Sequence, residues 1–502
     1  MSSRCAIVFL AAMSMALAAC NFAPHYARPT SEPAPAVYQE AGGWKTAQPA
    51  DAGNRGQWWS IYGDPQLDAL ENQVTVSNQN LKAAFARLQQ ARAQTRIERS
   101  SLFPTVTAGP RASRERQSVN SPTYNDTKPT IENDFAVNLD VSYEFDVWGR
   151  IRNLVSAAHA SEQASAADLA TLDLSMHAEL AADYFTLRSQ DTQQALLDRT
   201  ATDYSGALGL TQNLFNGGAA ALADLDQAKA QLQTALTQAA DNRLQRAQTE
   251  HAIAVLLGEN PSNFHLDPQP LKLDVVPPGI DPGMPSALLE RRPDVAAAER
   301  RVAAANAQIG VARAAYFPVF SLTALAGVES MGTSNLFTAP SREWSVGPQG
   351  VLTVFDGGLH RAQSAQAHAA YDEQVADYRN AVLSAYQDVE DNIVALRQLE
   401  LESVTETAAV AATTGALQQA QYRYSGGIAT YLEIVVAENA ALAARLSAAD
   451  IQLRRMVASV QLVRALGGGW SASAVGSPAV TPARDVAPTG SGGVPPAAAN
   501  TP

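Results

Sequence analysis

The sequence has little of the chemistry on which enzymes and metal proteins depend. It contains two cysteines, Cys5 and Cys20, and seven histidines that show no metal-ligand spacing. It has no Gly-x-Ser-x-Gly, no His-Glu-x-x-His and no phosphate-binding loop. Adjacent acids such as Glu390 and Asp391 would point to different faces of a helix, as solvated residues do. These absences argue against an enzyme.

Aromatic side chains and clusters of positive charge are also scarce. Aromatic residues make up 7% of the chain although 46% of it is hydrophobic, so alanine supplies much of the apolar total. Alanine favours helices in close contact rather than a thick core. The formal net charge is −13 and the basic residues are scattered, which argues against a nucleic-acid binder. No apolar run of transmembrane-helix length follows the first twenty residues.

The first twenty residues have the pattern of a secretory signal. Arg4 precedes an apolar run, Ala6 to Leu17, that is too short to span a bilayer as a helix. The following Leu-Ala-Ala-Cys20 resembles the bacterial lipoprotein cleavage box. This implies that residues 1–19 are removed and that Cys20 carries covalent lipid, the one cofactor we expect. An ordinary secretory signal with a chance cysteine is the alternative. Because Asn21 replaces the Asp of inner-membrane retention, the resemblance favours the outer membrane.

The rest of the chain contains one unit twice. The turns Asn216-Gly217-Gly218 and Ser425-Gly426-Gly427 are related by an offset of 209 in residue number. The same offset pairs Phe215 with Tyr424, Asp224 with Glu433 and Leu257 with Leu466. In the preceding segment an offset of 214 pairs Arg87 with Arg301 and Pro104 with Pro318. A register kept across a whole hairpin indicates an internal duplication.

The segments around these turns are predicted to be long helices. Val375, Val382, Val389 and Leu396 recur every seven residues with polar residues between them, which is coiled-coil spacing. Residues 361–424 contain no proline. At a rise of ~1.5 Å per residue this stretch would make a rod of roughly 96 Å. A compact domain needs no such rod, although a solvated spacer would show the same pattern.

Between the helices the pattern changes to period two. Residues 135–147 alternate apolar and polar side chains, which predicts a strand that suits lipid on one face and water on the other, although a soluble sandwich strand would alternate too. Its predicted partner is 105–116, and a second hairpin is expected within 318–356. Four strands cannot close a membrane barrel, and open edges in hydrocarbon are unfavourable. If the strands cross a membrane, the chain must therefore form oligomers.

The predicted fold is mainly α with a membrane β-barrel part, built from a duplicated unit of helix, β-hairpin and long helical hairpin. The expected segments are a signal (1–19), an anchor and strap (20–66), a helix (67–103), a β-hairpin (104–147), a long helical hairpin (148–258), a connector (259–285), a helix (286–317), a β-hairpin (318–356), a long helical hairpin (357–467) and a disordered tail (468–502).

Several motifs within this pattern resemble those of the TolC-like outer-membrane factors, in particular the lipoprotein subgroup that serves tripartite efflux pumps. They are Leu-Ala-Ala-Cys20, Trp58-Trp59, Asp64-Pro65-Gln66-Leu67, Phe145-Asp146-Val147-Trp148-Gly149-Arg150, Glu290-Arg291-Arg292-Pro293-Asp294, Phe355-Asp356-Gly357-Gly358 and Arg423-Tyr424 to Tyr431-Leu432. The resemblance implies a homotrimer in which a twelve-strand β-barrel in the outer membrane continues as a twelve-column α-helical barrel in the periplasm.

The resemblance also implies a function. The protein would be a passive exit duct of a tripartite efflux pump, in contact with outer-membrane lipid, a periplasmic adaptor (membrane fusion) protein and an inner-membrane pump of the resistance-nodulation-division type. A non-conducting lipoprotein scaffold that spans the periplasm is the alternative. By the same resemblance the adaptor would dock on the turns, at Gly217, Gly218, Gly426 and Gly427.

Site residues carried over from the resemblance lie at the inner tip. Leu432 matches the apolar constriction, and the gate would also include Tyr431, Glu433 and Tyr424. Val436 and Asn439 stand where relatives often place Asp and Arg. We therefore expect the gate to close by apolar contact rather than by a charged latch.

Overall fold

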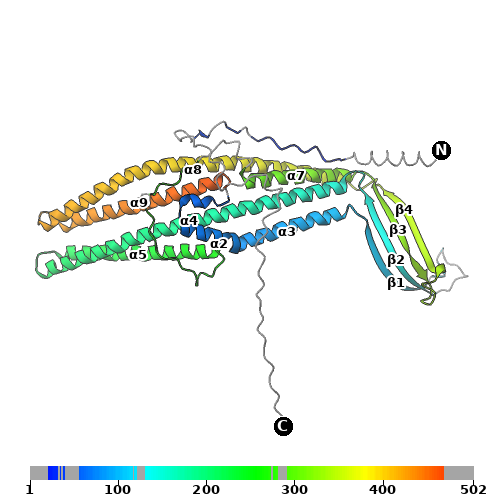
Figure 1. Ribbon diagram of the computed structural model, residues 1–502, viewed down its shortest axis with the longest axis horizontal. Helices are drawn as coiled ribbons and strands as arrows, with labels where there is room; N and C mark the ends of the chain where they lie inside the picture. Colours follow the sequence, from blue (N-terminus) through cyan, green and yellow to red (C-terminus); the bar gives the residue numbers. More distant parts are fainter. Residues whose placement is uncertain are drawn as a thin grey trace, which may run out of the picture.

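The computed structural model describes residues 21–31, 34–35, 38–39, 56–116, 118–120, 122, 131–272, 275–280 and 291–468. The predicted signal, Cys20 and nearly all of the predicted tail lie outside these residues. The molecule is elongated along two helices of 67 residues each, α4 (Arg150–Asn216) and α8 (Leu359–Ser425). Figure 1 shows both helices running from a four-stranded sheet at one end to paired tips at the other.

Shorter helices complete the rod on either side of its middle. In the half next to the sheet the neighbours run in the order α3, α4, α7, α8, and in the tip half in the order α5, α4, α9, α8. None of the described helices is both long and apolar enough to cross a membrane. The remaining elements are η2 (Trp58–Tyr62), α2 (Pro65–Ser77), α3 (Gln79–Ser100), β1 (Thr105–Arg116), β2 (Ile131–Phe145), α5 (Leu222–Leu256), α7 (Pro293–Ala314), β3 (Val319–Ser330), η4 (Ala339–Ser341), β4 (Arg342–Val351) and α9 (Tyr431–Ala465).

The element bounds confirm the internal duplication. The offset of 209 carries both ends of α4 onto those of α8, and both ends of α5 onto those of α9. The offset of 214 likewise carries the ends of α3 onto those of α7, and the ends of β1 onto those of β3. Three pairs of helices, α3 with α7, α4 with α8 and α5 with α9, therefore have identical lengths.

The sheet is antiparallel, with strand order β1-β2-β3-β4. Its register aligns the apolar side chains of all four strands on one face, because Val106 lies opposite Val141, Val141 opposite Ala324, and Ala324 opposite Val346. The adjacent row, on the other face, is Thr105, Ser142, Thr323 and Gly347. The alternation predicted along β2 thus extends across the whole sheet.

The strand limits differ from the prediction. Strand β2 ends at Phe145, so Val147 is not part of it. The reason is Asp146, whose carboxylate accepts hydrogen bonds from the backbone amides of Ile151 and Arg152 at 3.0 and 2.9 Å and so begins α4. Strand β4 ends at Val351, five residues before the predicted end of the second hairpin at 356.

The predicted single helix over 67–103 is wrong, because the chain breaks at Asn78. Its backbone has φ −59° and ψ 124°, and its side chain accepts a hydrogen bond from the amide of Leu81 at 3.0 Å. The Asn78 amide group also donates to the carbonyl of Leu256 at 2.8 Å. Asn78 is therefore both the cap of α3 and a contact with the end of α5. In the second copy α7 begins at Pro293, whereas residues 286–290 lie outside the described chain.

Buried ion pairs hold the connector against the middle of the rod. The carboxylate of Asp191 accepts hydrogen bonds from Arg188 at 2.9 Å, from Arg246 at 2.6 Å and from the amide of Gln269 at 2.8 Å. Arg246 also donates to the carbonyl of Leu266 at 2.7 Å. Because each buried charge has partners, the network compensates for the loss of hydration.

A buried histidine, His177 of α4, connects this helix to α2 through a hydrogen bond to Glu71. His177 stacks on Trp59, with ring centroids 4.5 Å apart, and its Nδ1 donates to Glu71 at 2.6 Å. Burial alone would lower the pKa of His177, but the carboxylates of Asp173 and Glu71 raise it to about 9. Burial raises the pKa of Glu71 to about 7 despite its bond to His177. The shared proton therefore stays on the histidine.

Replacing His177 with Gln should lower the free energy of unfolding by about 3 kcal/mol near pH 6, because Glu71 loses its buried partner. The folded-state pKa of His177 lies above the ordinary 6.5, so its contribution is complete below that pH and is lost as pH rises through about 9. Circular-dichroism melts from pH 6 to pH 10 should show a steeper loss for wild type than for His177→Gln. His159→Gln, at an exposed histidine of α4, should follow wild type. Parallel curves for wild type and His177→Gln would contradict this assignment.

Candidate functional site

Each long helical hairpin reverses at its pair of glycines. Gly217 and Gly426 have φ −83° and −82°, within the ordinary right-handed range. Gly218 and Gly427 have φ 77° and 71°, which favours glycine because a Cβ would be strained there. Only the second glycine of each predicted docking turn is therefore required by the backbone.

The second turn is closed by an ion pair. Arg423 near the end of α8 contacts Glu433 in the first turn of α9, with Nη1 and Oε2 2.9 Å apart. Glu433 follows Thr430, the residue before α9, and lies where a negative charge favours the helix N-terminus. The predicted gate residue Glu433 is thus bound within its own hairpin.

Tyr431 joins the two hairpins. Its side chain is 4% exposed and packs in a cluster with Ala228 of α5 and with Ala207 and Leu208 of α4. The ring of Tyr424 lies edge-on to that of Tyr431, with centroids 6.0 Å apart. The structure therefore brings the two predicted gate tyrosines together and uses them to pack α9 against the first copy.

Leu432 is placed differently. It adjoins Tyr431 in the chain, yet 60% of it is exposed, as is 61% of Val436 one turn further along α9. An apolar surface at the end of a rod is available for contact with other copies or for lining an opening.

A polar contact that the sequence did not predict also links the hairpins. The hydroxyl of Tyr204 on α4 donates to the side-chain oxygen of Asn439 on α9 at 3.2 Å. Asn439 thus adds a neutral hydrogen bond to the packing of the tip. In the sequence, the only feature that could have indicated this contact was a tyrosine within the alanine- and threonine-rich part of α4.

The same α4–α9 contact contains a partly buried acid, Glu438. One carboxylate oxygen of Glu438 is buried without a hydrogen-bond partner. Burial raises the pKa of Glu438 to about 7, and the charge of Asp203 on α4 adds to this. Burial likewise raises the pKa of Tyr204 to about 12, with Glu438 adding to the shift. The contact is thus formed by neutral and acidic groups, and it is most favourable when Glu438 is protonated.

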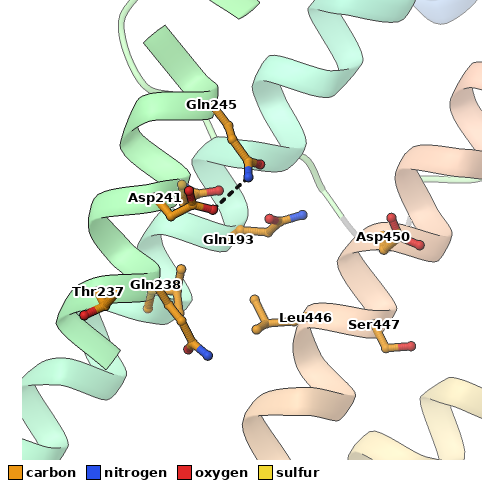
Figure 2. Close-up of a pocket in the computed structure, with 10 residues that line it drawn as sticks. Gln193, Thr237, Gln238, Asp241, Gln245, Leu446, Ser447 and Asp450 are labelled. Atoms are coloured by element: carbon orange, nitrogen blue, oxygen red, sulfur yellow. Dashed lines mark hydrogen bonds between the residues drawn. The ribbon is translucent and has the colours of Figure 1, made fainter. Parts of the chain in front are cut away.

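Between the tip and the middle of the rod the hairpins separate. A groove of about 690 Å³ lies there. Figure 2 shows its mostly polar lining residues, which come from α5, α9 and α4. Gln245 donates to Asp241 at 2.8 Å, and one side-chain oxygen of the buried Asn242 has no partner. The described part of the chain has no group of three His, Cys, Asp or Glu side chains arranged to hold a metal ion. The lining residues are Gln193, Leu197, Thr237, Gln238, Asp241, Asn242, Gln245, Leu446, Ser447 and Asp450.

The start of the strap is fixed at the junction of sheet and helices. Phe22 stacks on Phe317, with ring centroids 4.5 Å apart, and Phe317 lies 4.9 Å from Trp148. Further along, Asn306 of α7 donates to the carbonyl of Pro24 at 2.9 Å. The residue two positions after Cys20 is therefore held at the base of the sheet. Cys20 itself lies outside the described residues.

Comparisons with known proteins agree with this arrangement. The model of the outer membrane efflux protein family matches residues 70–259 and 284–468. Outer membrane protein OprJ of Pseudomonas aeruginosa is 34% identical over 464 residues, covering 91% of this chain and 95% of OprJ. Toluene efflux pump outer membrane protein TtgF of Pseudomonas putida is 31% identical over 475 residues, covering 91% of this chain and 96% of TtgF.

A solved structure agrees in fold as well as in sequence. The outer-membrane channel OprN superposes with a TM-score of 0.82 at 30% identity, covering 90% of this chain and 100% of OprN. A similarity of this extent covers the sheet, the long helices and the tips together. The family match, the relatives and the superposition lead to one conclusion, that this chain belongs to the outer membrane efflux protein family and is the outer-membrane channel component of an efflux pump.

Proposed function

We propose that this chain works as a homotrimer and forms a passive exit duct that carries small solutes from the periplasm through the outer membrane. The observation that carries the proposal is the continuity of the sheet with the rod. Helices α4 and α8 each have 67 residues, and at ~1.5 Å per residue each would extend roughly 100 Å from the strands to the tips. One copy thus supplies both a membrane segment and a wall of a long conduit.

The apolar face of the sheet supports its place in the outer membrane. Four large apolar side chains are exposed on that face, namely Val106, Leu139, Trp344 and Val346. Exposed apolar side chains in a continuous sheet are unfavourable in water and favourable against lipid. In three copies the four strands of each would give twelve, which can close into a barrel with no free edge.

The partners are inferred from the tips. We assign the turns at Gly217, Gly218, Gly426 and Gly427 to a periplasmic adaptor protein, and beyond it to an inner-membrane pump of the resistance-nodulation-division type. The duct itself performs no chemistry, and the pump would select the solutes. The name of TtgF describes a toluene pump. We therefore take small organic molecules, aromatic solvents among them, as the class of solute.

Gating would depend on Leu432. Its exposed side chain can narrow an opening in which three copies meet, and an apolar constriction excludes water until it widens. Tyr431, Tyr424 and the bond from Tyr204 to Asn439 would hold α9 in the narrowed position. Opening would then require the second hairpin to separate from the first at this contact.

Leu432→Ser should raise the single-channel conductance of the purified oligomer at least about two-fold in planar bilayers, because a hydroxyl removes the dewetted constriction. Leu222→Ser is the matched control, since Leu222 is also exposed and lies in the first turn of α5 at the other tip. Unchanged conductance in Leu432→Ser would place the constriction elsewhere. A wild-type oligomer that never conducts, even with Leu432→Ser, would favour a scaffold over a duct.

Conductance should also depend on pH through Glu438. Its pKa in the closed contact is about 7, above the ordinary 4.5, so closing takes up a proton. The closed state loses stability as pH rises from about 4.5 to about 7, and the oligomer should conduct more at pH 8 than at pH 5. Glu438→Gln should stay near the low-pH behaviour of wild type at both values. An equally large pH response in Glu438→Gln would assign the dependence to another group.

Lipid on Cys20 would anchor the strap at the base of the sheet, beside the fixed Phe22. Mass spectrometry of the mature amino terminus should find an acylated Cys20. Cys20→Ser should give a chain without lipid that keeps its helical spectrum but fractionates away from the outer membrane. An unmodified Cys20 in mature wild-type protein would rule out the anchor.

A further inference from the structure

The charged residues of the sheet are divided between its two faces by sign. Residues opposite each other on paired strands point to the same face, so the register assigns every strand residue to the apolar or the polar face. All acidic residues of the four strands lie on the polar face. The charged residues of the apolar face are all arginines, namely Arg114, Arg116 and Arg342. Because a soluble surface mixes both signs, this separation indicates a partner of negative charge.

The three arginines lie at one end of the sheet. Arg116 is the last residue of β1 and Arg342 is the first of β4, so both lie at strand ends remote from the helices, with Arg114 two residues before Arg116 (Figure 1). All three are exposed. Among the described residues no acid pairs with any of them, whereas Arg111 on the polar face contacts Glu115 at 3.8 Å. Their charges are therefore free to bind another molecule.

Aromatic side chains mark both limits of the apolar face. At the helix end of the sheet Phe145 lies opposite Phe320, and both are exposed. Towards the other end the same face carries Phe135 on β2 and the exposed Trp344 on β4. From Phe145 to Phe135 the strand extends roughly 33 Å at ~3.3 Å per residue, which at a tilt of about 40° spans about 25 Å. This is the height of the lipid-facing band of outer-membrane barrels.

The arginines lie just outside this band. Arg114 comes two residues after Ala112, which is opposite Phe135, and Arg342 comes two residues before Trp344 towards the strand end. A charge on the lipid face of a barrel is unfavourable at mid-depth and tolerated near the interface. The three guanidinium groups are therefore at the level of lipid headgroups.

The surroundings of the arginines favour an amphiphilic ligand over a small soluble anion. Arg116 lies opposite the exposed Ile131, and Arg342 lies opposite Val328. A ligand on this surface thus meets apolar side chains and positive charge together. The acids that would repel a phosphate are on the other face of the sheet.

We propose that Arg114, Arg116 and Arg342 bind the phosphate groups of anionic lipids in the outer-membrane leaflet remote from the helices. The proposal rests on the membrane-facing sheet of the proposed function and names the lipid class that this sheet prefers. A planar guanidinium group donates two parallel hydrogen bonds to phosphate oxygens. Arg114 and Arg116 are about 7 Å apart on one face, so each can hold one phosphate while the acyl chains cover the apolar band.

Native mass spectrometry of the purified oligomer tests the site. Wild type should bind dioleoyl phosphatidic acid about ten times more tightly than dioleoyl phosphatidylcholine, whose headgroup has no net charge. Changing all three arginines to Gln should raise the dissociation constant for phosphatidic acid about ten-fold and leave that for phosphatidylcholine unchanged. Arg111→Gln is the matched control, because Arg111 belongs to the same strand but lies on the polar face, and it should bind like wild type.

A second set of variants separates charge from folding. Changing the same three arginines to Lys keeps the charge but loses the paired hydrogen bonds, so binding should weaken by no more than about three-fold. All variants should remain oligomeric and conduct like wild type, because none of these residues lies at the tip. Inorganic phosphate in ten-fold excess should not displace phosphatidic acid, because it has no acyl chains. Displacement would indicate a site for soluble anions and overturn the lipid assignment.

The outcomes separate this site from the function. If wild type conducts but the triple Gln variant binds phosphatidic acid equally well, or Arg111→Gln weakens binding as much, the arginine site is wrong and the duct stands. If the arginines prefer phosphatidic acid as expected but no oligomer conducts, the duct fails and the lipid contact stands.

Discussion

The backbone hydrogen bonds of the outer strands impose the main constraint on this molecule. Strands β1 and β4 each pair on one side only within the described chain. In hydrocarbon each unpaired N–H or C=O costs several kcal/mol, so neither edge can remain open there. The helices follow from the same constraint, because α3, α4, α7 and α8 each begin or end beside a strand and therefore stand in strand order. In the proposed trimer, pairing of these edges would therefore also determine which helical columns of adjacent copies are neighbours outside the membrane.

The sequence predicted the parts of the fold that depend on local rules. Period-two alternation gave the strands, and the paired glycines gave the turns, because both patterns reflect the backbone or the solvent at each residue. Asn78 was missed as a break because its contact with Leu256 joins residues far apart in the chain. The bond between Tyr204 and Asn439 was missed for a related reason. A heptad pattern shows which face of a helix is apolar. It does not show which residue of a neighbouring helix a given polar side chain will contact.

The middle and the tip are stabilised by different interactions. The middle contains buried ion pairs around Asp191 and between His177 and Glu71, and breaking any one of them leaves a buried charge unpaired. The α4–α9 contact at the tip instead combines a neutral hydrogen bond, packing around Tyr431 and an acid without a partner. If α4 and α9 separated there, no buried positive charge would lose its partner. The chemistry of the two regions therefore supports a fixed middle and an adjustable tip.

The duplication has two different offsets, since α3 and β1 match α7 and β3 at 214 and the later helices match at 209. The change falls between the first and second strands of each hairpin, where the connection from Arg116 to Ile131 is longer than the one from Ser330 to Arg342. An insertion there lengthens a loop, whereas an insertion within a column would shift every contact beyond it. Around a ring of copies the columns would repeat almost six-fold, while the outer rim would alternate longer and shorter loops. The far end of the duct is thus the place where this architecture tolerates variation in sequence length.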